Sequence, residues 1–183
     1  MKKVAILPLM VFIGVVANAE IGSAPFAPEE FDVDIIQYPH MLQIENPQSE
    51  QLDTYYTFTN KEASYQIRYS FFKQTVKDYA DIKTAFSMCI LPIIWNIAGY
   101  ETDKITNFND SDVKDEFNGD FGATCSIVNS KSDYGDGYKY MVADFFYKNN
   151  QGIVIRTMLF NDLKFYRIDK TFLEIYHSFK FHE

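Results

Sequence analysis

The sequence predicts an α+β fold in which helices pack on an antiparallel β-sheet. Two stretches rich in β-forming residues, 52–59 and 64–73, flank a four-residue turn and predict an early hairpin. Three further stretches between residues 122 and 160 are joined by short turns and predict an antiparallel three-strand meander. Apolar residues recur at helical spacing between these groups and after them. This order of elements is typical of helices packed on an antiparallel sheet.

Residues 1–19 predict a secretory signal peptide. Lys2 and Lys3 precede a short apolar run, and a small-x-small pattern then predicts cleavage between Ala19 and Glu20. The apolar run is shorter than the roughly 20 residues of a membrane-spanning helix. A lipoprotein would carry a cysteine where Glu20 stands. We therefore expect a periplasmic or extracellular protein without stable membrane insertion.

Residues 20–30 predict an irregular lead-in, followed by a single α+β domain over residues 31–183. At its start, alternation over Phe31–Ile36 predicts a short strand, and the region from there to Gln51 predicts a loop. In the second hairpin strand, apolar residues alternate from Tyr65 to Phe71, with polar residues such as Arg68 between them. Period two predicts one core face and one polar face for this strand.

The segment 76–100 predicts a long helix, because apolar residues recur there at steps of three and four. Pro92 is expected to kink this helix or to begin a second short one, and Gly99 suits its end. Residues 85–98 are nearly all apolar but too few to span a bilayer. They predict a buried core helix.

The second half of the domain predicts a short helix, the meander and a closing helix. The run Asn109-Asp110-Ser111-Asp112 before Val113–Phe117 supplies an oxygen-bearing N-cap and acidic residues for the first turn of the short helix, and Gly119 follows its end. The meander strands are expected at 122–129, 138–148 and 153–160. The last two are apolar on both faces, which predicts a central position between helices. Helical spacing returns over 163–179.

Two features of the sequence carry a resemblance to a known family: the strand pair around Tyr56–Thr59 and Tyr65–Phe71, and the closing pattern Phe172-x-x-Ile175-x-x-Ser178-Phe179-x-Phe181. With the order of the elements, they resemble the Mog1/PsbP-like superfamily, whose domains combine an early hairpin, a helix, an antiparallel meander and a C-terminal helix on the sheet. The resemblance implies a binding or accessory protein and supplies no functional residue. The long apolar helix around Pro92 departs from the family pattern, so a cystatin-like or NTF2-like cone stays open as an alternative.

Charge and cysteine content narrow the function classes. Without the signal peptide, the chain has 15 Lys and Arg against 25 Asp and Glu, a net charge of −10. Such a charge disfavours nucleic acid and anionic lipid as partners. Cys89 and Cys125 are a possible disulfide in an oxidising compartment, and two buried thiols are the other interpretation.

No pattern of catalytic, metal-binding or cofactor-binding residues stands out. His177 adjoins Ser178 but would point away from it on a helix, His182 is next to the last residue, and His40 follows a proline. Zinc, calcium and phosphate-loop spacings are all missing. We therefore expect a non-catalytic binding or accessory protein, without a cofactor, for an unknown protein partner. A carrier of a lipid or other apolar molecule in an aromatic-lined cavity is one alternative, and a small hydrolase using His40 or His177 is another.

Overall fold

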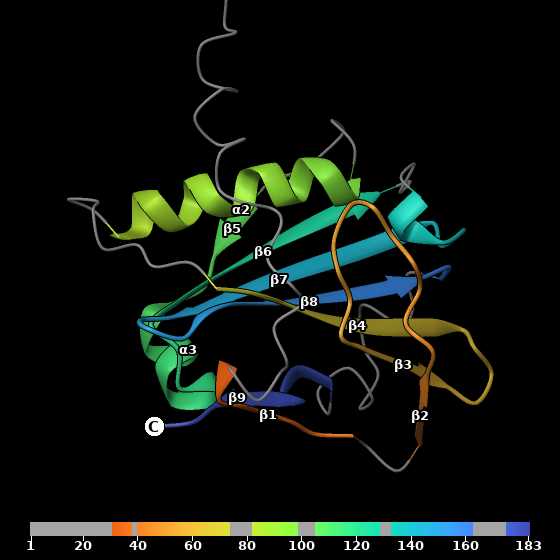
Figure 1. Ribbon diagram of the computed structural model, residues 1–183, viewed down its shortest axis with the longest axis horizontal. Coiled ribbons are helices and arrows are strands. Elements are labelled where there is room, and N and C mark those ends of the chain that lie inside the picture. Colours follow the sequence, from red (N-terminus) through yellow and green to blue (C-terminus); the bar gives the residue numbers. More distant parts are fainter. Residues whose placement is uncertain (1–30, 38–39, 74–81, 99–104, 129–132, 163–174) are drawn as a thin grey trace, which may run out of the picture.

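The computed structural model describes residues 31–37, 40–73, 82–98, 105–128, 133–162 and 175–183. Within them, the chain forms a seven-stranded antiparallel sheet, a two-stranded sheet and the helices α2 and α3 (Figure 1). The predicted α+β class with an antiparallel sheet is therefore confirmed. The signal peptide, its cleavage at Ala19 and Glu20, and the lead-in 20–30 lie outside the described residues and stay predictions.

The large sheet has the strand order β2-β3-β4-β8-β7-β6-β5, with every neighbouring pair antiparallel. It contains both predicted units. The hairpin joins the meander through the pairing of β4 with β8, which runs from Tyr65 opposite Phe160 to Phe72 opposite Ile153. The hairpin consists of β3 (Tyr56–Asn60) and β4 (Tyr65–Phe72), and the meander of β6 (Phe121–Val128), β7 (Tyr140–Lys148) and β8 (Gly152–Phe160).

Two short strands that the sequence did not predict form the edges of this sheet. The expected loop up to Gln51 contains β2 (Met41–Ile44), which pairs with β3. At the other edge, β5 (Ile105–Asn107) pairs with β6. Segments this short show too few alternations for a period of two to be recognised. Their strand conformation depends on pairing with the neighbouring strand.

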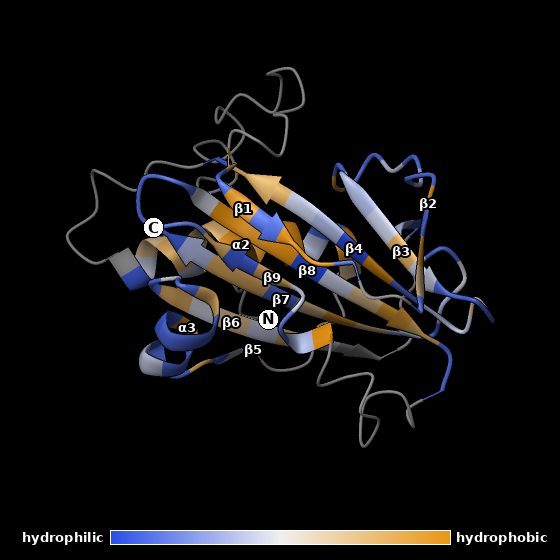
Figure 2. Cartoon of the chain, turned by 90° about the horizontal axis from the view of Figure 1, so that it is seen from below, coloured by the Kyte–Doolittle hydropathy of each residue, from blue (hydrophilic) through white to orange (hydrophobic). Residues whose placement is uncertain are grey.

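The sheet is buried on both faces, as the apolar meander strands predicted. Helix α2 covers a first cluster on one face, and α3 with the two-stranded sheet covers a second cluster on the other (Figures 1 and 2). The prediction that Tyr65 to Phe71 turn their apolar residues to the core is confirmed, and the opposite face of β4 is buried as well, since Arg68 is only 1% exposed. The first cluster includes Phe86, Ile90, Ile94, Cys125, Met141, Phe145 and Ile155, and the second includes Phe31, Phe58, Tyr69, Phe117, Val142, Phe146, Phe179 and Phe181.

Helix α2 (Ile82–Ala98) is one continuous helix with Pro92 inside it, so the expectation of a second helix at Pro92 was wrong. One side of α2 packs on the first cluster through residues such as Phe86, Ile90 and Ile94. The helix is not wholly buried, however, because Met88 and Trp95 are 45% and 46% exposed. The predicted extensions 76–81 and 99–100 lie outside the described residues.

Helix α3 (Asp110–Phe117) confirms the predicted short helix and its N-cap. The Asn109 side chain accepts a hydrogen bond from the backbone N–H of Ser111. The left-handed residue at the C-terminus is Asn118, with φ of 55°, and not the glycine after it. Asparagine tolerates this conformation, and its N–H reaches the carbonyls of Val113 and Lys114.

The predicted closing helix 163–179 was wrong at its end. Of its described part, Ile175 and Tyr176 are helical, whereas Phe179 begins β9 (Phe179–Phe181). Residues 163–174 lie outside the described residues. Strand β9 pairs with β1 (Val33–Ile35), which confirms the predicted first strand. The partner strand lies at the far end of the sequence, so local periodicity holds no information about this pairing.

Candidate docking face

The side of α2 turned away from the sheet is apolar. Met88, Leu91, Pro92 and Trp95 follow one another at helical spacing, and we call these four residues the α2 outer face. Met88 and Trp95 are nearly half exposed, while Leu91 and Pro92 are half-buried. In Figure 1, α2 forms the outermost layer of the described elements on its side of the sheet.

A surface helix usually carries charged or polar residues on its outer side. In α2, no charged residue occurs from Thr84 to Ala98, so the helix is apolar on both sides. Single exposed apolar residues are common on protein surfaces and need no explanation. On α2, the exposed Met88 and Trp95 lie on either side of the half-buried Leu91 and Pro92, so the four form one continuous apolar strip. This arrangement is typical of a surface that contacts a partner.

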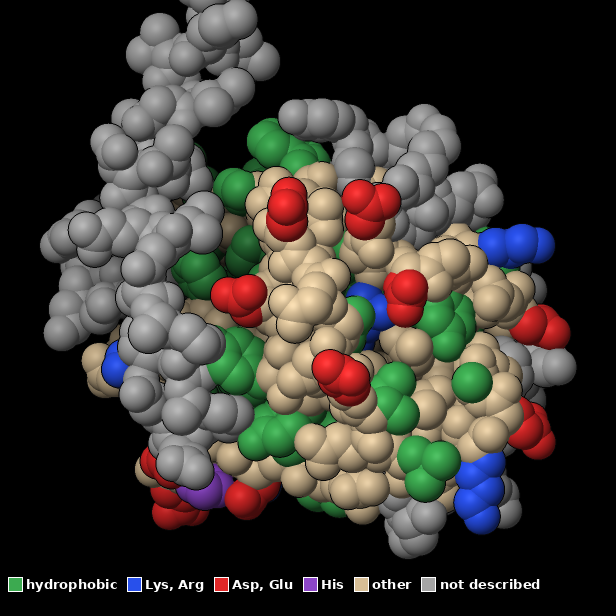
Figure 3. Space-filling view, turned by 45° about the vertical axis from the view of Figure 1, so that its right-hand side comes forward, with side chains coloured by type: hydrophobic (Ala, Val, Ile, Leu, Met, Phe, Trp, Pro, Cys, Tyr) green, Lys and Arg blue, Asp and Glu red, His purple; other side chains and the backbone are tan. Residues whose placement is uncertain are grey.

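Acidic residues stand at both ends of the α2 outer face. At the start of α2, the Lys83 ammonium pairs with the Asp110 carboxylate of α3 at 2.5 Å. At its far end, α2 packs against the 3₁₀ turn η3 (Asp133–Gly135), near which Asp133 and Asp136 are exposed (Figure 1). Further acidic side chains lie near the middle of the molecular surface that Figure 3 shows. The docking face therefore has an apolar centre, an ion pair at its start and acidic residues at its far end.

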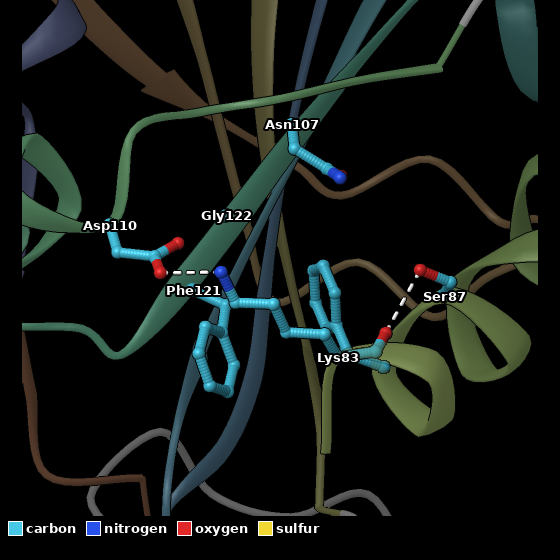
Figure 4. A pocket seen from close by; sticks show the side chains of 7 residues that line it. Lys83, Ser87, Asn107, Asp110, Phe121 and Gly122 are labelled. Atoms are coloured by element: carbon cyan, nitrogen blue, oxygen red, sulfur yellow. Dashed lines mark hydrogen bonds and ion pairs between the residues drawn. The ribbon is translucent and has the colours of Figure 1, made fainter. Parts of the chain in front are cut away.

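A shallow hollow lies beside the first turn of α2. Figure 4 shows the Lys83 side chain crossing it to Asp110, and the ammonium lies 5.3 Å from the centroid of the Phe121 ring. The Ser87 hydroxyl donates to the Lys83 carbonyl oxygen at 3.0 Å. Because its lysine and its carboxylate are paired with each other, the hollow forms a polar rim to the docking face. Its lining residues are Lys83, Phe86, Ser87, Asn107, Asp110, Phe121 and Gly122.

Two buried arginines anchor peripheral segments to the sheet, and sequence reasoning missed both roles. Arg156 of β8 is fully buried and pairs with Asp144 of β7, with 2.8 Å between Nη2 and Oδ2. Its Nη1 donates to the carbonyls of Ile175 and Tyr176 at 2.8 and 2.7 Å. This arginine therefore holds the C-terminal segment on the sheet. The rings of Phe117, Phe146, Tyr176 and Phe179 surround its guanidinium at 5.5–5.9 Å.

Arg68 of β4 plays the corresponding role on the α2 side. Its guanidinium donates to the Tyr134 carbonyl at 2.5 Å and to the Gln66 amide oxygen at 2.8 Å. The exposed carboxylate of Asp136 lies 3.4 Å away. Burial lowers the pKa of Arg68, and the nearby Tyr134 and Asp136 oppose that effect. The contacts fix η3 over the sheet, next to the end of α2.

The three histidines considered as catalytic residues do not form a common site in the described structure. His40 is half-buried just before β2, and His177 is exposed beside the rings of Phe117 and Tyr176. His182 lies between two carboxylates, Asp32 and Asp34. Within the described residues, no group of three metal-binding side chains is found. The hypothesis of a histidine-based hydrolase therefore gains no support from these contacts.

Cys89 of α2 and Cys125 of β6 both lie on the α2 side of the sheet. Cys125 is buried in the first cluster, and Cys89 is half-buried and packs against the same cluster. Both are thiols in this structure. Their shared cluster is compatible with either of the two interpretations, so the disulfide stays a prediction.

Comparison of the chain with family models, curated proteins and solved structures finds no match. Among the described helices, none is both long and apolar enough to cross a membrane. The docking face therefore has to be interpreted from its own geometry and chemistry.

Proposed function

We propose that this protein is a secreted, non-catalytic binding or accessory protein that docks a partner protein on the α2 outer face. One observation carries the proposal: α2 is apolar on both sides, but the sheet covers only one of them. Trp95 and Met88 are residue types that are enriched at protein interfaces. Such a helix face is an expected binding site for an apolar surface of another protein.

The partner that fits this face best is the apolar side of an amphipathic helix that carries basic residues. Residues three and four apart on α2 form ridges that pack against a second helix. The exposed Asp133 and Asp136 at the far end would attract these basic residues, whereas Asp110 at the start of α2 is already paired with Lys83. The net charge of −10 and the lack of basic residues along the α2 outer face disfavour an anionic membrane as occupant.

The apolar carrier is supported less well. It would need a cavity lined with aromatic side chains, but in the second cluster these side chains contact one another. The centroid of the Phe117 ring lies 4.4 Å from that of Phe146 and 5.0 Å from that of Phe179. The hollow beside α2 contains an ion pair instead of an apolar lining. These contacts favour a filled core and a partner on the surface.

The Mog1/PsbP-like sandwich is proposed as the finer description of the fold. The early hairpin, α2 and the meander occur in the order that suggested the resemblance, whereas the closing pattern ends in strand β9 and not in a helix. Family members of this kind are binding or accessory proteins, in agreement with the proposed role. The periplasmic location is part of the same proposal and rests on the signal-peptide pattern in residues 1–19.

Trp95 provides a direct test, because it is the only tryptophan of the chain. The probe is a synthetic amphipathic helix of leucine and lysine, titrated into the purified mature protein. Docking on α2 would remove Trp95 from water and shift its fluorescence emission to shorter wavelength. A matched helix of leucine and glutamate, and zwitterionic or anionic lipid vesicles, should leave the emission unchanged.

Two variants locate the contact. Met88→Glu places a charge in the α2 outer face and should weaken probe binding by about ten- to a hundredfold, the effect of losing an interface anchor. Leu42→Glu is the matched control, because Leu42 is 47% exposed and Met88 is 45% exposed. Leu42 lies on the edge strand β2, whereas α2 packs against β6 and β7 toward the other edge of the sheet. No emission shift with the lysine helix, or a shift with vesicles alone, would contradict the proposal. An equal shift with the glutamate helix would contradict the proposal that the partner carries basic residues.

A further inference from the structure

The two-stranded sheet ends in a histidine held between two carboxylates. His182 follows β9, and its Nδ1 lies 2.5 Å from Oδ1 of Asp32, just before β1. Its Nε2 lies 2.8 Å from Oδ1 of Asp34 within β1. A neutral imidazole has one N–H and can donate to only one of these oxygens. Donation to both carboxylates requires the doubly protonated imidazolium ring.

We propose that His182, Asp32 and Asp34 form a pH-sensitive clasp that holds the N-terminal strand β1 against β9. Among the described strands, β1 pairs only with β9. The pairing is flanked by two backbone hydrogen bonds, from Ile36 N–H to the Ser178 carbonyl and from His182 N–H to the Asp32 carbonyl. Because β1 has only three residues, the side-chain contacts at its end contribute a large share of the stability of its pairing with β9.

The clasp closes over the second cluster. Phe31 is fully buried in that cluster, and Val33 and Ile35 pack against it. Opening of β1 would expose these side chains and the edge of β9. Opening of the clasp would therefore uncover an apolar surface on the side of the sheet opposite the α2 outer face. This opening does not depend on the docking proposed for α2.

Other charged groups also face His182. The Lys148 ammonium at the end of β7 donates to the His182 carbonyl oxygen, and the Asn118 amide donates to the same oxygen at 3.0 Å. Lys180 stands opposite Asp34 in the β1–β9 register. The exposed Glu183 follows in sequence. The two lysines oppose the imidazolium charge, whereas Asp32 and Asp34, which bond the ring directly, favour it.

The direction of the pH response follows from these contacts. Hydrogen bonds to Asp34 and then to Asp32 raise the pKa of His182 above its ordinary value of 6.5. The charged ring is therefore favoured in the folded state. The stabilisation by the clasp is fully present below the ordinary pKa of histidine and is lost as the pH rises through the raised one. The clasp is closed at acidic pH and loosens on the alkaline side.

Amide hydrogen exchange on the mature protein tests the clasp. The protection factors of Ile36 N–H and His182 N–H, corrected for intrinsic exchange, are measured across the ring titration followed by NMR. We expect both to fall about two- to fivefold as His182 loses its proton, the range of a surface ion pair. In His182→Gln, both should be low at every pH. Asp34→Asn should lower the pKa of the ring.

His177→Gln is the matched control, because His177 is also exposed and lies in the same C-terminal segment. This variant should keep the pH-dependent fall of the protection factors. Protection that is independent of pH in the unaltered protein would overturn the clasp. So would a fall of the same size in His182→Gln, or a ring pKa of His182 that Asp34→Asn leaves unchanged.

Discussion

The buried ion pair between Asp144 and Arg156 is the interaction whose loss should destabilise the fold most clearly. Replacing Asp144 by alanine removes the contacts from Oδ2 to Nη2 at 2.8 Å and to Nε at 3.3 Å. The guanidinium would remain fully buried with the carbonyls of Ile175 and Tyr176 as its remaining polar partners. Breaking a buried pair in this way costs about 3–5 kcal/mol.

Such a loss is a large part of the about 5–15 kcal/mol that stabilises a domain. Urea unfolding at neutral pH, followed by far-UV circular dichroism, measures it as a lower midpoint with an unchanged slope. Asp144→Asn keeps an oxygen acceptor and should cost less than Asp144→Ala. A loss below about 1 kcal/mol for Asp144→Ala, within the range of a surface pair, would show that the buried pair contributes little to stability.

A double variant and a control complete this test. In Asp144→Leu with Arg156→Met, both charges are absent, so stability should recover toward that of the unaltered protein. Asp136→Asn alters the exposed carboxylate that lies 3.4 Å from Arg68. It should cost no more than about 1 kcal/mol, because the carboxylate is screened by water.

Two further changes test local features of the fold by the same unfolding measurement. Asn109→Ala removes the side-chain cap of α3 and should cost about 1 kcal/mol, whereas an unchanged midpoint would show that the cap is dispensable. Gly152→Ala should destabilise strongly, because φ is +117° and the new Cβ would lie 2.5 Å from the Phe72 carbonyl oxygen. A loss below about 1 kcal/mol would contradict that close approach.

Local patterns predicted the parts of the fold that depend on nearby residues. The hairpin and the meander are defined by alternation and short turns, and α3 by its cap and its acidic first turn. Strand β9 and the edge strands β2 and β5 were missed because their pairing partners decide their conformation. In the closing segment, the spacing of Phe179 and Phe181 fits a strand as well as a helix end, and pairing with β1 selects the strand.

Local sequence patterns likewise reveal some of the functional residues and not others. One signal for the buried ion pair is present in the sequence: Asp144 and Arg156 are the only charged residues in the interior of two apolar strands joined by a tight turn. Counting outward from Lys148 opposite Gly152 places them directly across from each other. The apolar character of α2 was also evident in the sequence. Whether its outer side is covered as well depends on how the other elements are arranged around it, which local sequence does not show. The His182 cluster joins both ends of the domain, and no local pattern reveals it.

The most direct test of the docking face is site-specific photo-crosslinking in an extract of cells that express the protein. A photoreactive residue at position 88 on α2 is compared with one at position 42 on β2, which are almost equally exposed in the unaltered protein. We expect protein adducts from position 88 that disappear when the leucine–lysine helix is added. Any adducts from position 42 should be unaffected by the helix. Adducts from position 42 alone, or adducts from position 88 that the helix does not displace, would contradict the proposed docking.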